Sequence, residues 1–280
     1  MANNMIEKAH AGDFLGRFRE IVSDPLNTLI RRHELAGVVQ GEEVFLHNGH
    51  AVPLRGTGSY YGTFGDILVI NRGVHEPLEE YLFQQTLERV SGKPVMLELG
   101  AYWGHYSMWL KRVFPEAITY LVEPVEDNLD AGRKNFERNG YEGIFIRDKV
   151  GLGGFSVDAF FNDSALEKLD ILHCDIQGFE QEMVEGAVGA FKNRKIDYAF
   201  VSTHSENLDN SISDFFNSVG YRIEASSSFV HHTTSHDGFI FAASPGAAPV
   251  VSRNKFFGRE DVVRSTPSQI LQYLADVCES

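Results

Sequence analysis

Short apolar runs alternate with helix-length segments over most of this 280-residue chain, starting near residue 78. The runs are VMLELG (95–100), TYLVEP (119–124), IFIRDKVG (144–151), LDILHCDI (169–176) and DYAFVSTH (197–204). Continuous apolar runs of this length are typical of strands that are buried on both faces. Their alternation with helices predicts an α/β fold with a doubly wound, mostly parallel sheet.

The segments between these runs have helical character. They are HYSMWLKRVF, EDNLDAGRKNFERNG, FEQEMVEGAVGAF and LDNSISDFFNSVG, and a further helix over LEEYLFQQTLERV follows Pro77. Two later runs, YRIEASSS and DGFIFAAS, are separated only by a polar loop, so we expect them to pair as an antiparallel hairpin. The sheet should therefore be parallel except at its C-terminal end.

This pattern predicts a catalytic domain over 76–245, an N-terminal extension over 1–75 and a C-terminal tail over 246–280. In the extension, Pro25 interrupts a helical pattern, and a hairpin should turn at 47–49, where Asn-Gly favours a tight turn. The segment GTGSYYGTFGDILVINRG reads as a twisted strand pair or as a lid or wall of a substrate site. The tail should end in a helix capped by Thr266, either a contact in a homodimer or a clamp on the sheet.

The charge balance of the chain bears on its partners. The 25 Lys and Arg residues against 39 Asp and Glu residues give a net charge of −14. Such a charge repels phosphate backbones and anionic membranes, so we expect a small-molecule or carbohydrate partner rather than nucleic acid. The two cysteines are too few for a disulfide framework, and no apolar stretch approaches the roughly 20 residues that cross a bilayer. We therefore expect no membrane association and a cytoplasmic location.

The first strand runs directly into the turn ELGAYWGHYS at 98–107. Gly100 and Gly104 could admit a ligand close to the backbone at the N-terminus of the next helix, or they could serve only close packing of strand and helix. Glu98 would repel a pyrophosphate but attract an ammonium or sulfonium group.

A carboxylate at the end of the second strand adds a second cofactor signal. Glu123 lies where open α/β folds place the acceptor for a ribose diol, although it could be a solvated side chain. A glycine turn, Glu98 and Glu123 together point to S-adenosylmethionine, which carries a carboxylate, an ammonium, a sulfonium and a ribose. Further candidate contacts to this cofactor are Tyr102, Tyr106, Ser107, Asp148 facing adenine, and Arg72, which could pair with the cofactor carboxylate or form a surface ion pair.

Several segments together resemble the FkbM-type methyltransferase family over about residues 76–245. They are VMLELGAYWGHYSMWL, YLVEPVEDNL, LDILHCDIQGFEQEMVEGA, DYAFVSTHSE and HDGFIFA. Where the family often has Lys-Ile-Asp-Val-Glu-Gly, this chain has His173-Cys174-Asp175-Ile176-Gln177-Gly178, a Gln variant that leaves the acid–base assignment open. The resemblance implies a Rossmann-like class I methyltransferase sheet of seven strands, with the cofactor over the first two strands and the acceptor above the fourth and fifth.

Methyl transfer to an alcohol requires removal of the hydroxyl proton, by a base or with help from a metal that acidifies it. Asp175, His204 and Asp237 are candidate ligands for Mg²⁺, Mn²⁺ or Fe²⁺. Without a metal, His204 or His173 could act as the base, or the site could work by positioning alone. Gln177 and Tyr60 are candidate contacts to the acceptor, which we expect to be a sugar or another natural product.

Two other functions remain open at this point. A nicotinamide-dependent oxidoreductase would share the strand, the glycine turn and the later carboxylate, but GAYWG lacks the G-x-G-x-x-G fingerprint. A binding module without catalysis would keep the sheet for partner recognition. The presence of Glu98, Gly100, Gly104, Glu123 and Asp175 argues against it.

Overall fold

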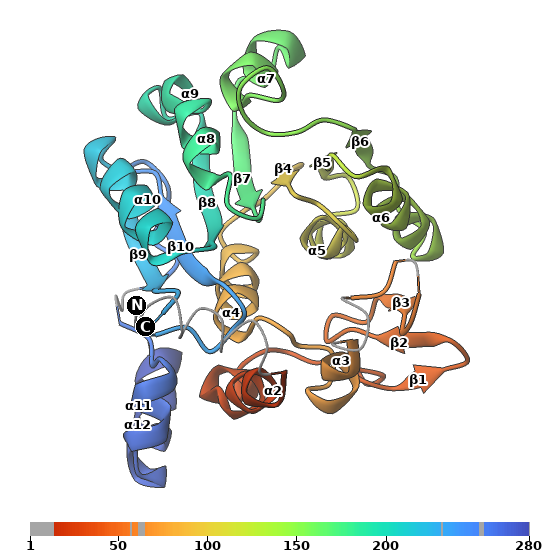
Figure 1. Cartoon of the computed structure of the whole chain (residues 1–280), viewed down its shortest axis with the longest axis vertical. Helices are drawn as coiled ribbons and strands as arrows, with labels where there is room; N and C mark the ends of the chain where they lie inside the picture. Colours follow the sequence, from red (N-terminus) through yellow and green to blue (C-terminus); the bar gives the residue numbers. More distant parts are fainter. Residues whose placement is uncertain (1–13, 57, 61–64, 231, 252–254, 280) are drawn as a thin grey trace.

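The computed structural model describes residues 14–279 except 57, 61–64, 231 and 252–254 (Figure 1). Its main sheet has seven strands in the order β6-β5-β4-β7-β8-β10-β9. They are β4 (Val95–Leu99), β5 (Ile118–Val122), β6 (Ile144–Ile146), β7 (Leu169–Cys174), β8 (Ile196–Thr203), β9 (Arg222–Ser227) and β10 (Gly238–Ala243). In this sheet, β10 alone runs opposite to the other strands, and it pairs antiparallel with both β8 and β9. This confirms the predicted α/β fold, with the class I methyltransferase arrangement of a Rossmann-like sheet.

Helices cover both faces of this sheet. They are α4 (Pro77–Thr86), α5 (His105–Val113), α6 (Glu126–Arg138), α7 (Val157–Ser164), α8 (Glu180–Glu185), α9 (Val188–Lys192), α10 (Glu206–Ser218) and α12 (Pro267–Cys278). The short helix α11 (Arg259–Arg264) has no buried residue and belongs to neither core. Neighbouring strand residues face opposite sides. Met96 and Phe200 pack in one core with α4, α5 and α12, whereas Leu97 and Ala199 pack in another with α7, α8, α9 and α10. Burial of this kind explains why the central strands β4, β7 and β8 could be located from sequence, whereas the edge strand β6 is only partly buried.

Two local expectations were wrong. The segment FEQEMVEGAVGAF forms two short helices, α8 and α9, rather than one. The Gly186 carbonyl accepts hydrogen bonds from the Asp158 N–H and the Ser156 hydroxyl. Because this carbonyl points toward α7, it does not accept a helical hydrogen bond, and the helix ends there. The run DILVI, expected in a strand pair, is helix α3 (Asp66–Ile70), and residues 61–64 just before it lie outside the described part. In α3 Ile67 and Leu68 are buried while Ile70 is exposed, so packing of one side overrides the β propensity of the run.

The N-terminal extension packs beside the large sheet. It contains α2 (Phe14–Ser23), the 3-10 helix η1 (Pro25–Thr28) and a small antiparallel sheet of β1 (Val39–Gln40), β2 (Glu43–Phe45) and β3 (Ala51–Pro53). The predicted hairpin is confirmed, since β2 and β3 pair across the segment 46–50. At the other end of the chain, Tyr273 and Val277 of α12 are buried in the core that also contains α4. The terminal helix therefore clamps onto its own chain. Across the described residues, no helix combines the length and the hydrophobicity that spanning a bilayer requires.

A buried histidine in the hairpin should make folding sensitive to acid. His50 Nε2 lies 3.1 Å from the Tyr141 hydroxyl. Burial, helped by the charges of Arg112 and His47, lowers the pKa of His50 to about 3. Folded His50 is thus neutral, whereas in the unfolded chain it gains a proton near pH 6.5. Its contribution is therefore present above pH 6.5 and is lost as the pH falls from 6.5 toward 3, by about 2 kcal/mol at pH 5.

The variant His50→Gln should lose less stability between pH 8 and pH 5 than the wild-type chain does, because glutamine does not titrate. Urea unfolding at both pH values measures the difference. An identical loss in the two proteins would show that His50 does not couple folding to protonation.

Candidate active site

A cavity of about 1000 Å³ opens at the carboxyl ends of β4, β5, β7 and β8, next to the start of β10. Open α/β sheets bind their ligands at this edge. Eleven of the residues singled out from sequence line it: Tyr60, Glu98, Gly100, Tyr102, Tyr106, Glu123, His173, Asp175, Gln177, His204 and Asp237. The structure therefore brings these residues together around one cavity.

Glu98 is the acidic residue near the end of β4. Its side chain is buried, and its Oε2 accepts a hydrogen bond from the Ser107 backbone N–H at 3.1 Å. The carboxylate thus accepts the hydrogen bond of an N–H group in the first turn of α5, and this group is no longer available to an anionic ligand. Burial raises the pKa of Glu98, although His173 and the contacts with Ser107 oppose the shift. Placed in the cavity wall, Glu98 favours cationic ligand groups over phosphates.

The two glycines of the turn are required by packing. A Cβ on Gly100, whose φ is +74°, would lie 1.7 Å from the Asp175 carbonyl oxygen, and one on Gly104 would lie 2.9 Å from the Phe136 ring. The sequence allowed two interpretations of these glycines, ligand approach to the backbone or close packing, and the structure shows the close packing directly. Gly100 also lines the cavity, whereas Gly104 does not belong to its lining. The packing brings the loop after β7 against the end of β4, which places Asp175 beside the turn at 98–107.

Glu123 follows β5 and is held by three donors. Its Oε1 accepts from the Val125 N–H at 3.0 Å and from the Asn128 amide at 3.3 Å, and its Oε2 accepts from the Tyr102 N–H at 3.3 Å. Tyr102 has a left-handed backbone, with φ +43°, and its hydroxyl donates to the Ser59 carbonyl at 2.6 Å. The carboxylate is therefore fixed at the cavity wall, where Oε2, which has a single donor, retains capacity for a further one.

Besides Gly104, three more predicted cofactor residues lie outside the cavity lining. Arg72 is exposed. Ser107 is fully buried behind Glu98, which it holds through its backbone. Asp148 is partly buried and accepts from the Lys149 N–H at 2.7 Å; the lining instead contains Lys149 and Val150. The only Arg or Lys side chain that the N-terminal extension contributes to the described lining is Arg17 of α2, which bonds to the Ser235 carbonyl. No motif marks Arg17 in the sequence, because it reaches the site only through folding of the extension.

Asp175, His204 and Asp237 come from three separate strand ends and meet in the cavity. His204 Nε2 lies 3.2 Å from Asp175 Oδ1 and 3.5 Å from Asp237 Oδ1. The three potential ligand atoms all lie within 4.8 Å of one another. On the other side of the ring, His204 Nδ1 lies 2.8 Å from Glu180 Oε1. The predicted trio therefore forms a cluster, with Glu180 orienting the imidazole.

These charges perturb one another strongly. Burial would lower the pKa of His204, but its bonds to Asp175 and Glu180 and the charge of Asp237 raise it to about 11. Burial raises the pKa of Asp237 to about 7, with His204 opposing and Asp175 reinforcing the shift. Asp175 shifts the other way: burial is outweighed by His204, and its pKa is lowered. Without a bound cation, His204 is thus an imidazolium, which has no lone pair with which to accept a proton.

His173, the alternative base, stands apart from this cluster. Its Nε2 lies 2.5 Å from Glu79 Oε1, and its ring packs on Tyr106 with centroids 4.1 Å apart. The other Glu79 oxygen accepts from the Ser202 hydroxyl at 3.2 Å. Burial lowers the pKa of His173 and raises that of Glu79 well above its usual range. His173 is therefore a neutral group held in the wall.

Sequence reasoning missed Glu180, Glu79 and Glu76. Glu180 lies two residues after Gly178, in the segment that carries the family resemblance. It is completely buried next to His204, and its position in the sequence does not reveal this burial. Glu79 and Glu76 lie in the first turn of α4 and at its cap, where acidic residues are ordinary, so nothing in the sequence distinguishes them from solvated ones. Only the fold turns Glu79 toward β7 and Glu76 toward Tyr106, whose hydroxyl donates to it at 2.8 Å.

Carboxyl groups outnumber the Arg and Lys side chains in the cavity lining, where His204 adds a further positive charge. The described carboxylates of the lining are Glu76, Glu98, Glu123, Asp175 and Asp237, and its described Arg and Lys side chains are Arg17 and Lys149. An excess of carboxylates repels phosphorylated ligands and attracts cationic ones. The lining also has flat aromatic faces, including Tyr60 and Trp103, whose ring centroids lie 5.2 Å apart. The cavity therefore suits a ligand with positive charge and planar rings.

Comparison with family models and with curated proteins finds no match. Among solved structures, the chain is similar to TrmK of M. capricolum in complex with S-adenosylhomocysteine, at 16% identity over 69% of this chain and 81% of that one, with a TM-score of 0.43. It is also similar to precorrin-6y C5,15-methyltransferase from Geobacter metallireducens, at 13% identity over 59% and 86% of the chains, with a TM-score of 0.44. A third is the N-terminal domain of EvdMO1 with S-adenosylhomocysteine bound, at 18% identity over 58% and 79%, with a TM-score of 0.41. Similarity at this level leaves function to be argued from the residues of the site itself.

Proposed function

We propose that this chain is an S-adenosylmethionine-dependent methyltransferase that methylates a hydroxyl group of a small, neutral acceptor such as a sugar or a natural product. The observation that carries the proposal is the pair of buried carboxylates, Glu98 and Glu123, in the wall of an acidic cavity at the ends of β4 and β5. A dinucleotide would place its pyrophosphate against this negative wall. The resemblance of residues 76–245 to FkbM-type methyltransferases agrees with this proposal.

The cavity residues match the groups of this cofactor. Glu123, fixed by its three donors, would accept a hydrogen bond from a ribose hydroxyl through Oε2. Glu98 would attract the ammonium or sulfonium charge, and Tyr102 and Gly100 would form the adjoining wall. When bound, the cofactor supplies an electrophilic methyl group. The protein then has to align the acceptor with it and exclude water, and alignment of this kind can contribute up to roughly 7–11 kcal/mol.

The cluster at the other end of the cavity would organise the acceptor. Asp175, His204 and Asp237 fit a hard divalent cation such as Mg²⁺, Mn²⁺ or Fe²⁺, because two carboxylates and an imidazole converge there. Such a cation would make a bound hydroxyl more acidic. Glu180 at Nδ1 fixes the ring of His204 so that Nε2 faces the two aspartates. Gln177, whose amide donates to Asp175 at 3.3 Å, would hold this carboxylate from the open side.

The acceptor is proposed to be neutral and ring-shaped. The excess of carboxylates in the lining disfavours phosphorylated and other anionic acceptors, nucleic acid included. Tyr60 offers a flat face on which a sugar ring can pack, and it lines the cavity together with Asp175. Incubating the protein with methyl-labelled cofactor and a panel of sugars, phenols and polyhydroxylated compounds tests this. Label should appear on an oxygen of an uncharged acceptor; transfer only to nucleic acid or protein would overturn the proposed acceptor class.

The variant Glu123→Ala should weaken binding of S-adenosylmethionine by about 10- to 100-fold, because hydrogen bonds to a charged group contribute roughly 1.5–3 kcal/mol. Isothermal titration measures the affinity directly. Glu142→Ala is the matched control, since Glu142 is exposed and does not line the cavity. Equal affinity in the two variants would show that Glu123 does not contact the cofactor.

A further inference from the structure

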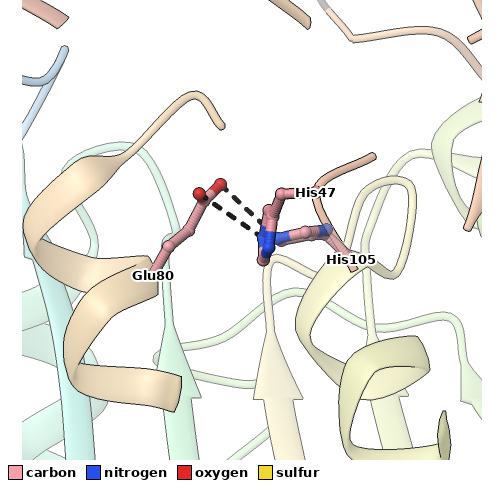
Figure 2. Close-up of side chains that lie close together, drawn as sticks. All are labelled: His47, Glu80 and His105. Carbon is pink, nitrogen blue, oxygen red and sulfur yellow. Dashed lines mark ion pairs between the residues drawn. The ribbon is translucent and has the colours of Figure 1, made fainter. Parts of the chain in front are cut away.

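A second group of potential metal ligands lies deep in the protein, at the junction between the N-terminal extension and the large sheet. It consists of His47, Glu80 and His105 (Figure 2). His47 lies in the turn between β2 and β3, Glu80 in α4, and His105 is the first residue of α5. The three residues are 0%, 0% and 1% exposed. We call this group the buried His–Glu cluster.

The distances within the buried His–Glu cluster exceed those of hydrogen bonds. His47 Nε2 lies 3.5 Å from Glu80 Oε2, and His105 Nε2 lies 3.6 Å from Glu80 Oε1. N–H···O hydrogen bonds measure about 2.7–3.2 Å between heavy atoms. Two ligand atoms about 2.0–2.1 Å from one tetrahedral zinc ion lie roughly 3.3–3.5 Å apart. The two measured distances, which involve different oxygens of Glu80, are close to this spacing, and one potential ligand atom of each residue lies within 4.8 Å of the others.

Polar atoms that face one another in this cluster lack partners. Nε2 of His47, Nε2 of His105 and Oε2 of Glu80 have no hydrogen-bond partner among the described residues. Burying a polar atom without a partner is unfavourable, and three such atoms at one place call for a common partner. Burial also lowers the pKa of His47 to about 4 and that of His105 well below its usual range. Neutral imidazoles have the lone pair that a metal ion requires.

Neighbouring side chains orient the cluster. His75 Nδ1 lies 2.6 Å from Glu80 Oε1, and the His75 backbone N–H donates to the same oxygen at 3.2 Å. Trp103 stacks on the His105 ring, with centroids 5.5 Å apart and an angle of 18° between the planes. Metal-binding carboxylates and imidazoles are commonly fixed by such outer contacts. The ligands are thus held in place before any ion arrives.

We propose that His47, Glu80 and His105 bind one divalent transition-metal ion, with Zn²⁺ as the preferred occupant. Two imidazoles and one carboxylate suit zinc better than the harder ions expected at Asp175, His204 and Asp237. His105 also lines the large cavity, which gives the ion a path of entry. The ion would tie the hairpin and α4 to the first turn of α5, the turn whose backbone holds Glu98. Its role is therefore to stabilise the wall of the cofactor site, separately from methyl transfer.

Metal content and thermal stability test the proposal in the full-length chain. The protein is stripped with a chelator, incubated with Zn²⁺ and desalted, in a background of Asp175→Asn and Asp237→Asn so that the other cluster does not contribute. Elemental analysis should find one zinc per chain. At about 100 times the dissociation constant, Zn²⁺ should raise the melting temperature by about 5–10 °C.

In the same background, the variants His47→Gln, Glu80→Gln and His105→Gln should each lose the bound zinc and the thermal shift. His50→Gln is the matched control, because His50 is also a buried histidine of the hairpin but lies outside the cluster. Should a variant fail to fold, the absorption bands of Co²⁺ bound to the folded background protein still report whether nitrogen ligands hold the ion. The absence of stoichiometric zinc and of such bands, or full zinc retention in the His47 and His105 variants, would overturn the proposal.

Discussion

The variant Asp175→Asn should lower kcat at least about 100-fold while it leaves the affinity for S-adenosylmethionine within about twofold. Asp175 contacts His204 Nε2 at 3.2 Å and belongs to the cluster with Asp237. It follows β7, which β4 separates from β5 and Glu123, and we assign this part of the cavity to the acceptor. Removal of its charge would weaken a bound cation and the orientation of the imidazole together. Loss of proton removal from an acceptor typically costs 10²- to 10⁴-fold in rate.

Initial rates with labelled cofactor, combined with calorimetry, separate the two effects. Asp163→Asn serves as the control, because Asp163 is an exposed aspartate of α7. If a cation is involved, a chelator should reproduce the defect in the wild-type chain, and Mg²⁺, Mn²⁺ or Fe²⁺ should reverse it. Unchanged turnover in Asp175→Asn, His204→Gln and Asp237→Asn would remove this cluster from the reaction.

The variant Gly100→Ala should lower the free energy of unfolding by more than about 3 kcal/mol. Its Cβ would lie 1.7 Å from the Asp175 carbonyl oxygen, so β4 and the loop after β7 would have to separate. The left-handed backbone adds about 1–2 kcal/mol of strain, and overpacking typically adds another 1–3 kcal/mol.

Gly92→Ala provides a matched control for this clash. Gly92 has a φ of +72°, close to the +74° of Gly100, but nothing lies within 4 Å of its added Cβ. Its loss of stability should stay within about 1 kcal/mol, since the strain is partly offset by the lower entropy of the unfolded chain. Urea unfolding of both variants measures the difference. Equal effects would mean that the close approach at Gly100 does not matter for folding.

The central parallel strands β4, β7 and β8 could be predicted because they are largely buried and therefore form continuous apolar runs, whereas the edge strand β6 is only partly buried although its run is apolar. Local signals failed where tertiary contacts decide the structure. The carbonyl of Gly186 turns toward α7 and divides a predicted helix, and the β-branched run at α3 becomes helical because only one of its sides is buried. The spacing of residues along the chain predicts neither of these tertiary contacts.

The site shows the same division. Asp175, His204 and Asp237 were predicted to meet because the carboxyl ends of parallel strands share one edge, and the antiparallel β10 begins there. Arg72, chosen for its position ahead of α4, is exposed away from the cavity lining. The buried His–Glu cluster joins positions 47, 80 and 105, whose spacing fits no short motif. It becomes visible only when the hairpin is packed against α4 and α5.

The most direct test of the account is a crystal structure of the chain with S-adenosylhomocysteine. The account predicts the nucleoside in the cavity beside β4 and β5, with a ribose hydroxyl bonded to Glu123 and its amino group on the side of Glu98. Isomorphous crystals soaked with NAD should show no dinucleotide there. Dinucleotide density along the turn at 98–107, in a protein that leaves S-adenosylhomocysteine unbound, would contradict it.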